Sequence, residues 1–146
     1  MSGPTLVIEL AEPLSPAVLG EFRALMVGLS SSFDEKRPGV GDEGLFEAEH
    51  ADEPEVEAVL GFRPTHAVNV SACCNGGIDH VATALLTAAV MDVIGGVAKA
   101  ELLDGQVPVV AGLPGVLGIA DDDWTVLGTA EFLRAWAGHP AFRLLK

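Results

Sequence analysis

Residues 66–103 read HAVNVSACCNGGIDHVATALLTAAVMDVIGGVAKAELL, and this stretch decides the fold. Residues 65–73 alternate weakly, which is typical of a strand with one well-buried face. The turn-forming residues at 75–77 (NGG) tolerate a positive φ and allow the chain to reverse. Residues 80–94 then carry a single carboxylate among apolar and small side chains. Because a helix that is apolar nearly all round is a buried one, this segment is predicted to be the central helix.

The same stretch marks both ends of this helix. Asp79 is placed at its first turn, where a carboxylate meets unpaired amides and the positive end of the helix dipole. Gly95 and Gly96 end the helix as a C-terminal cap would. Residues 97–102 alternate again, as a partly exposed strand does. The apolar length falls short of the roughly 20 residues that a membrane span needs, so we expect a core helix.

The rest of the chain is short or polar enough to pack onto this unit. Apolar spacing and turn residues predict strands at 5–10, 45–49 and 116–119 and helices at 16–29, 52–60 and 130–137, with 124–127 open between a strand and a bend. Asp104-Gly105 is a hairpin signal before residues 107–110, and residues 141–145 are expected to form a last short strand. Together these elements predict one α+β domain over residues 1–146. Its sheet is mostly antiparallel, with the buried central helix and two amphipathic helices around it.

Charge is the most unusual global property of the sequence. The chain has 21 Asp and Glu against 8 Lys and Arg, a formal net charge of −13. Nucleic acids and anionic membranes are bound through Lys and Arg, so this balance argues against both as partners. It suits a basic protein partner, which the field would attract. Acidity that only keeps the protein in solution explains the balance about equally well.

The acidic residues concentrate in one tract between residues 42 and 57. Its eight carboxylates, with no Lys or Arg among them, are Asp42, Glu43, Glu47, Glu49, Asp52, Glu53, Glu55 and Glu57. Like charges at this density repel one another, and a bound basic partner would relieve the repulsion. The tract is therefore the candidate partner-binding surface, against the simpler interpretation of a solvated face.

A second candidate site lies where the strand of residues 65–73 meets the central helix. Cys73, Cys74, Asp79 and His80 bring together a nucleophile, a carboxylate and a base. A helix N-terminus stabilises a thiolate, with His80 as base and Asp79 as the orienting group. The simpler interpretation makes the cysteines small buried side chains, Asp79 a cap and His80 a hydrogen-bonded helix residue, and it is favoured.

The sequence contains few signals for a metal, a nucleotide or export. His66, Cys73, Cys74 and His80 do not have the spacing of a metal site, and the glycines form neither a dinucleotide-binding motif nor a P-loop, so no cofactor is expected. Adjacent cysteines bridge only with strain, which favours a reducing compartment. No basic segment followed by an apolar run opens the chain, and a cytoplasmic protein is expected.

Several short motifs resemble a bacterial family of small proteins of unknown function. They are Cys74-Asn75, Asp79-His80 opening an apolar helix, Gly95-Gly96 before a strand, and Phe132-Leu133, Trp136, His139-Pro140, Phe142 and Lys146 at the carboxyl end. The resemblance covers roughly residues 62–146 and brings no catalytic residues with it. Such small acidic proteins are similar in character to the immunity proteins of polymorphic-toxin systems, which bind and block a toxin. By that analogy the acidic surface would face a basic toxin.

The leading hypothesis is therefore a non-enzymatic, acidic protein-binding domain that uses the tract at 42–57. An immunity protein against a basic toxin is its more specific form. The alternative is a small cysteine-dependent enzyme that uses Cys73 or Cys74 with His80. Neither the identity of a partner nor the oligomeric state follows from the residues.

Overall fold

The computed structural model of the chain describes residues 3–12, 14–29, 39–40, 43–48, 54–72, 76–120 and 124–144. Within these ranges the chain forms a mixed α+β fold built on a seven-stranded sheet with the strand order β2-β3-β4-β1-β5-β7-β6. Every described strand pair is antiparallel. The predicted α+β class with an antiparallel sheet is confirmed.

The strands agree with the apolar alternation of the sequence except at β2, which it did not predict. Their bounds are β1 (Thr5–Leu10), β2 (Gly39–Val40), β3 (Glu43–Ala48), β4 (His66–Ala72), β5 (Val97–Glu101), β6 (Val116–Ile119) and β7 (Thr125–Gly128). The open choice at residues 124–127 is thus decided for a strand. β1 lies in the middle of the sheet, between β4 and β5.

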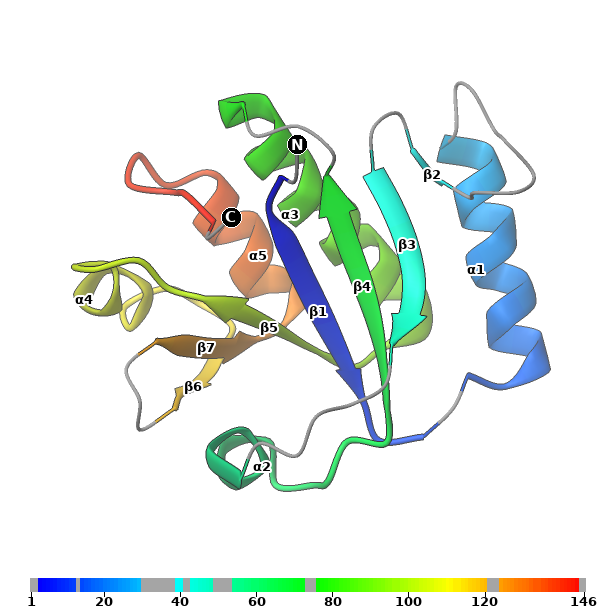
Figure 1. The fold of residues 1–146 in the computed structure, drawn as a ribbon, viewed down its shortest axis with the longest axis horizontal. Helices are drawn as coiled ribbons and strands as arrows, with labels where there is room; N and C mark the ends of the chain where they lie inside the picture. Colours follow the sequence, from blue (N-terminus) through cyan, green and yellow to red (C-terminus); the bar gives the residue numbers. More distant parts are fainter. Residues whose placement is uncertain are drawn as a thin grey trace.

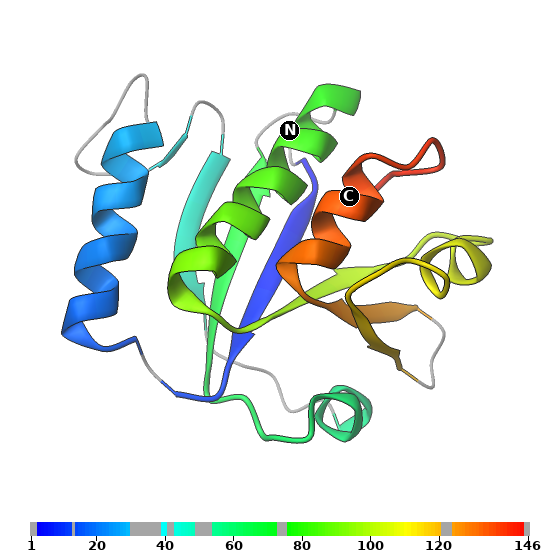
Figure 2. The same cartoon turned by 180° about the vertical axis from the view of Figure 1, so that it is seen from behind.

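The helices lie at α1 (Pro16–Leu29), α2 (Pro54–Leu60), α3 (Gly77–Ile94), α4 (Val107–Val110) and α5 (Ala130–Ala137). α3 and α5 lie side by side over one face of the sheet, and α1 flanks α3 (Figures 1 and 2). The packing of α3 and α5 on the sheet follows from the sequence, since the long apolar helix can bury its surface only against the sheet and its neighbours.

Two glycines show that the helices use both faces of the sheet. A Cβ on Gly128 would lie 2.5 Å from Cδ2 of Phe132 in α5, whereas a Cβ on Gly118 would lie 2.5 Å from Cγ1 of Val59 in α2. Gly118 is paired with Leu127, and paired residues of neighbouring strands point to the same face. Leu127 and Gly128 are successive residues of one strand and point to opposite faces, so Gly118 and Gly128 do too. α2 therefore packs on the reverse face, at the β6–β7 end.

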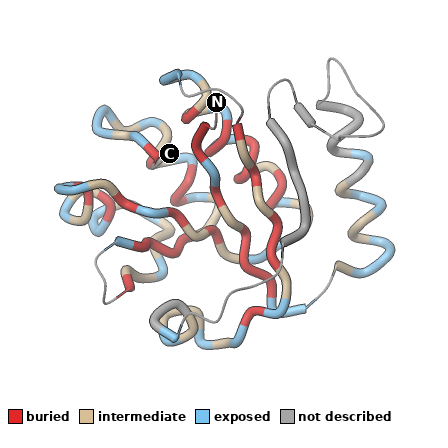
Figure 3. The backbone as a smooth tube through the Cα atoms, viewed as in Figure 1, coloured by how far each residue is buried: buried red, intermediate tan, exposed pale blue. Residues whose placement is uncertain are grey.

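The core lies between the sheet and the α3–α5 layer (Figure 3). α3 buries eight residues: His80, Thr83, Ala84, Leu86, Thr87, Ala88, Val90 and Met91. Of the helices in the described part of the chain, α3 alone is long and apolar enough to cross a membrane by length and composition. Its packing between β1, β4 and α5 accounts for that composition as a core helix, as predicted.

Two local predictions were wrong. Asp104-Gly105 does form a turn, with Gly105 at φ 81°, but the chain then enters the helical turn α4 and not a hairpin strand. Pro108 suits the first turn of a helix, where its missing amide costs nothing, and the Oε1 of Gln106 accepts a hydrogen bond from the Leu103 amide at 2.8 Å across the preceding turn. The expected strand at residues 141–145 is absent over 141–144, where the chain is irregular and docks on α3 and α4 by single hydrogen bonds.

Candidate functional site

Asp79 and His80 lie in the first turn of α3. The helix begins at Gly77, three residues before His80. The Gly76 amide donates a hydrogen bond to Oδ2 of Asp79 at 2.7 Å. Asp79 thereby satisfies one of the amides that a helix N-terminus leaves without a partner. The predicted capping role of Asp79 is confirmed.

His80 is buried beneath the carboxyl-terminal segment, with 2% of its surface exposed. Its Nδ1 accepts a hydrogen bond from the Leu144 amide at 3.0 Å. An acceptor Nδ1 requires the neutral tautomer with its proton on Nε2. Burial lowers the pKa of His80 below its ordinary value of 6.5, the charge of Arg143 lowers it further, and Asp79 acts in the opposite direction.

These contacts give His80 a structural role. A general base must reach the proton it removes, and Nδ1 of His80 already holds the backbone at Leu144. Cys73 and Cys74 lie outside the described residues, so the cysteine-dependent alternative stays a prediction. Among the described residues, no three His, Cys, Asp or Glu side chains gather in a group that could hold a metal ion.

The segment that covers His80 is tied down at several points. Nε2 of Gln106 donates to the Arg143 carbonyl at 3.0 Å. The ring of Phe142 packs edge-on against Trp136, with ring centroids 5.3 Å apart. These contacts join α3, α4, α5 and the carboxyl-terminal segment into one packed end of the molecule.

The acidic tract does not occupy a single element. Glu43 and Glu47 lie on β3, whereas Glu55 and Glu57 lie on α2. β3 is next to one edge strand of the sheet, and α2 packs on β6 and β7 at the opposite end of the strand order. Asp42, Glu49, Asp52 and Glu53 lie outside the described residues. The fold therefore divides the tract between two regions.

Most cations among the described side chains are already used in ion pairs. Nε of Arg63 lies 3.6 Å from Oε1 of Glu57, and Nζ of Lys99 lies 3.3 Å from Oε1 of Glu9. Arg134 in α5 pairs with Asp92 in α3. The described, exposed carboxylates Glu12, Glu21, Glu101, Asp104 and Glu131 take part in no ion pair within the described part of the chain. The negative excess is therefore presented to solvent.

A groove that the sequence did not indicate lies where β1 ends and α1 begins. It has a volume of about 510 Å³ and is lined mainly by apolar side chains, with the carboxylate of Glu12 among them. Four separate parts of the chain form it, and the lining residues are 10–12, 14, 15 and 18 in the first part, then 62, 94 and 96–97. Local spacing carries no signal for such a site, because the segments meet only in the folded chain.

The comparisons with known proteins give one match. The model of a protein family described as "Family of unknown function (DUF6368)" matches residues 37–146. No curated protein and no solved structure matches the chain.

Proposed function

The chain belongs to the DUF6368 family, and on that premise we propose that it is a non-enzymatic domain that binds a basic protein through carboxylates. Neutralisation of a basic toxin, as by an immunity protein, is the more specific form of this proposal. The proposed contacts are the carboxylates of the tract at 42–57, which would meet the partner from two regions of the fold, β3 and α2. The family assignment itself carries no activity, so the proposal depends on the residues.

The distribution of charge is the observation that carries the proposal. The net charge is −13, and three cations of the described part are held in ion pairs within the fold. An uncompensated field of one sign accelerates the approach of an oppositely charged partner and raises binding specificity. The structural role of His80 also supports binding in preference to catalysis.

The test compares two variants with equal loss of charge. The tract variant replaces Glu43, Glu47, Glu55 and Glu57 by Gln. The matched control replaces Glu21, Glu101 and Glu131 by Gln and Asp104 by Asn, all exposed and outside the tract. Each of the three proteins is used to capture partners from a lysate of the source organism at low and high salt.

A basic protein held by the parent and the control, and released by the tract variant, is the expected result. Its affinity for the tract variant, measured by calorimetry, should fall about tenfold or more, with a weaker dependence on salt. Equal losses in the two variants would show that only total charge matters and would overturn the assignment to the tract. Capture of no basic protein by the parent would overturn the proposal itself.

A further inference from the structure

The apolar groove near Glu12 is formed in advance of any ligand. The Thr65 amide donates to the Leu10 carbonyl at 3.0 Å, and Oγ1 of Thr65 donates to the Ala11 carbonyl at 2.9 Å. These bonds fix the chain after β1 against the segment that carries Phe62. On the other side, the Gly95 amide closes α3 by donating to the Met91 carbonyl at 2.8 Å. The walls of the groove are therefore held by hydrogen bonds to backbone carbonyls.

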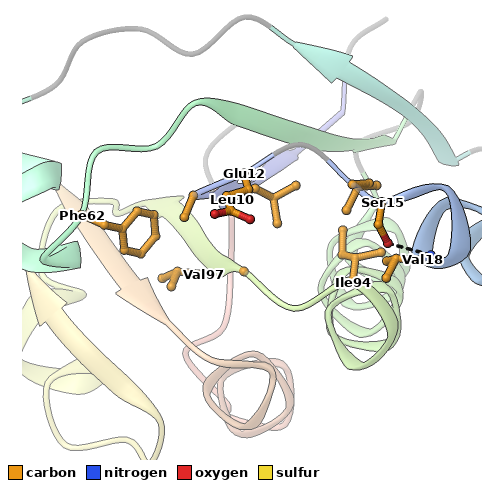
Figure 4. Close-up of a pocket in the computed structure, with 10 residues that line it drawn as sticks. Leu10, Glu12, Ser15, Val18, Phe62, Ile94 and Val97 are labelled. Atoms are coloured by element: carbon orange, nitrogen blue, oxygen red, sulfur yellow. Dashed lines mark hydrogen bonds between the residues drawn. The ribbon is translucent and has the colours of Figure 1, made fainter.

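Gly96 allows α3 to end directly against β1. It has a φ of 87°, and a Cβ there would lie 2.7 Å from Cγ2 of Ile8 and 2.8 Å from both the Glu9 carbonyl oxygen and Cδ2 of Leu10. Only glycine fits this conformation and this approach. The end of α3 and the end of β1 thus line one groove together (Figure 4).

The electrostatics of the groove favour a cation. Glu12 is the one charged residue among those that line it, and its side chain is exposed. In Figure 4 it lies between Phe62 and Val97 on one side and Ile94 and Val18 on the other. The C-terminal end of α3, which carries partial negative charge, reaches the same groove and has no basic residue in its last turn. A carboxylate and a helix C-terminus therefore converge on an apolar surface.

We infer that this groove receives a Lys or Arg side chain, with an adjoining large apolar side chain, from a segment of the basic partner protein. The inference rests on the proposed function and assigns it a docking point outside the acidic tract. The apolar stem of Lys or Arg packs on Leu14 and Ile94 while its charged head meets Glu12, as such side chains do at amphipathic surfaces. The groove is open to solvent and cannot enclose a small ligand. It therefore suits a side chain that projects from a segment of a larger protein.

The probe is a synthetic peptide, acetyl-Ala-Leu-Lys-Phe-Ala-amide, added to the full chain labelled with ¹⁵N. Its counterpart carries norleucine in place of Lys, and n-butylammonium serves as the free amine. The protein variants are E12Q and E101Q, which lose one carboxylate each. Glu101 is exposed at the far end of β5 from Val97, so E101Q is the matched control.

The Lys peptide should shift the amides of Phe62, Gly96 and Val97 and bind about tenfold more tightly than the norleucine peptide. E12Q should reduce that binding to the norleucine level, and E101Q should preserve it. No shift at these amides, equal affinity for both peptides, or unchanged affinity in E12Q would overturn the inference. Binding of n-butylammonium as tight as that of the Lys peptide would overturn the assignment to a protein segment.

The outcome is distinguishable from that of the capture experiment. Capture of a basic partner together with a failed peptide titration would remove the groove and leave the proposed function in place. A positive titration together with no captured basic partner would remove the proposed function, and with it the commitment to a partner segment as the occupant.

Discussion

Glu9 and His80 are both buried titratable residues, but they lie on opposite sides of the sheet and avoid the cost of burial in different ways. Glu9 is 1% exposed on the reverse face and is paired with Lys99. His80, on the α3 side, is neutral and accepts a hydrogen bond from the backbone. A buried carboxylate is stabilised only while its cationic partner is present. A neutral hydrogen-bond acceptor, in contrast, keeps its bond only while it stays unprotonated. The two faces should therefore respond to different perturbations.

The largest expected effect is on the Glu9 side. Lys99→Met keeps the length of the side chain but leaves the Glu9 carboxylate buried without this cation. Removing one partner of a buried ion pair typically costs about 3–5 kcal/mol, and we expect a loss of that order in urea unfolding.

The double variant E9Q/K99M is the control for Lys99→Met. With the carboxylate neutralised as well, most of the lost stability should return, since a neutral pair carries no uncompensated charge. A loss below about 1 kcal/mol in K99M would show that the pair matters little and that the two faces do not differ in this way.

His80→Ala should have the next largest effect. It leaves the Leu144 amide without its acceptor and opens a cavity beneath the carboxyl-terminal segment, at a cost of about 2–4 kcal/mol. His80→Asn retains an acceptor atom near the position of Nδ1 and should recover about 1 kcal/mol or more. Hydrogen exchange at the Leu144 amide measures directly whether its hydrogen bond to His80 is formed. Equal protection of that amide in the parent and in H80A would contradict the assigned role.

The pH dependence of stability separates the two faces further. The pKa of His80 is lowered in the folded protein, so protonation favours the unfolded chain. The contribution of His80 is therefore complete above its unfolded pKa of 6.5 and declines as the pH falls through and below that value. Unfolding free energies measured between about pH 7.5 and 5.5 should decline more steeply in the parent than in H80N. We expect the difference to be smaller than the cost of H80A, and identical slopes would refute the mechanism.

The smallest effect is expected at the surface, where α3 and α5 are joined by Arg134 and Asp92. Both side chains are about half exposed, at 47% and 53%. Exposed ion pairs contribute about 0–1 kcal/mol, so Arg134→Gln should lower the unfolding free energy by no more than that, and 0.5 M salt should mask the change. A double-mutant cycle with Asp92→Asn measures the coupling. A coupling free energy above about 2 kcal/mol would show that this exposed pair contributes as much as a buried ion pair.

The central part of the fold could be predicted because its signals are local. The strand at 66–72, the helix at 77–94 and the strand at 97–101 each follow from apolar spacing and glycine position, and the cap at Asp79 follows from residue type. The strand expected at 141–145 fails for a long-range reason, because Leu144 and Arg143 bond to His80 and Gln106 far back in the chain. Apolar spacing at the carboxyl end cannot tell a strand from a segment docked by such bonds.

The candidate sites could be predicted only in part. The roles of Asp79 and His80 agree with the interpretation made from residue type. The acidic tract is contiguous in sequence, yet Glu47 and Glu57 lie on elements at opposite ends of the sheet order. The groove at Glu12 had no local signal, since Phe62 and Ile94 reach it from distant segments. Contiguity in sequence is thus a poor guide to contiguity on a folded surface.

The central position of β1 has a consequence for synthesis. β1 leaves the ribosome before β4 and β5, the two strands that flank it, and its pairing with β5 needs the chain through Glu101. At translation rates of about 5–20 residues per second, Leu6, Ile8 and Leu10 wait roughly 5–18 s for their complete set of neighbours. Until β4 is made, a strand destined for the middle of the sheet has two open edges, and one edge stays open until β5 follows. The nascent chain is therefore a better substrate for a ribosome-associated chaperone than the finished protein is.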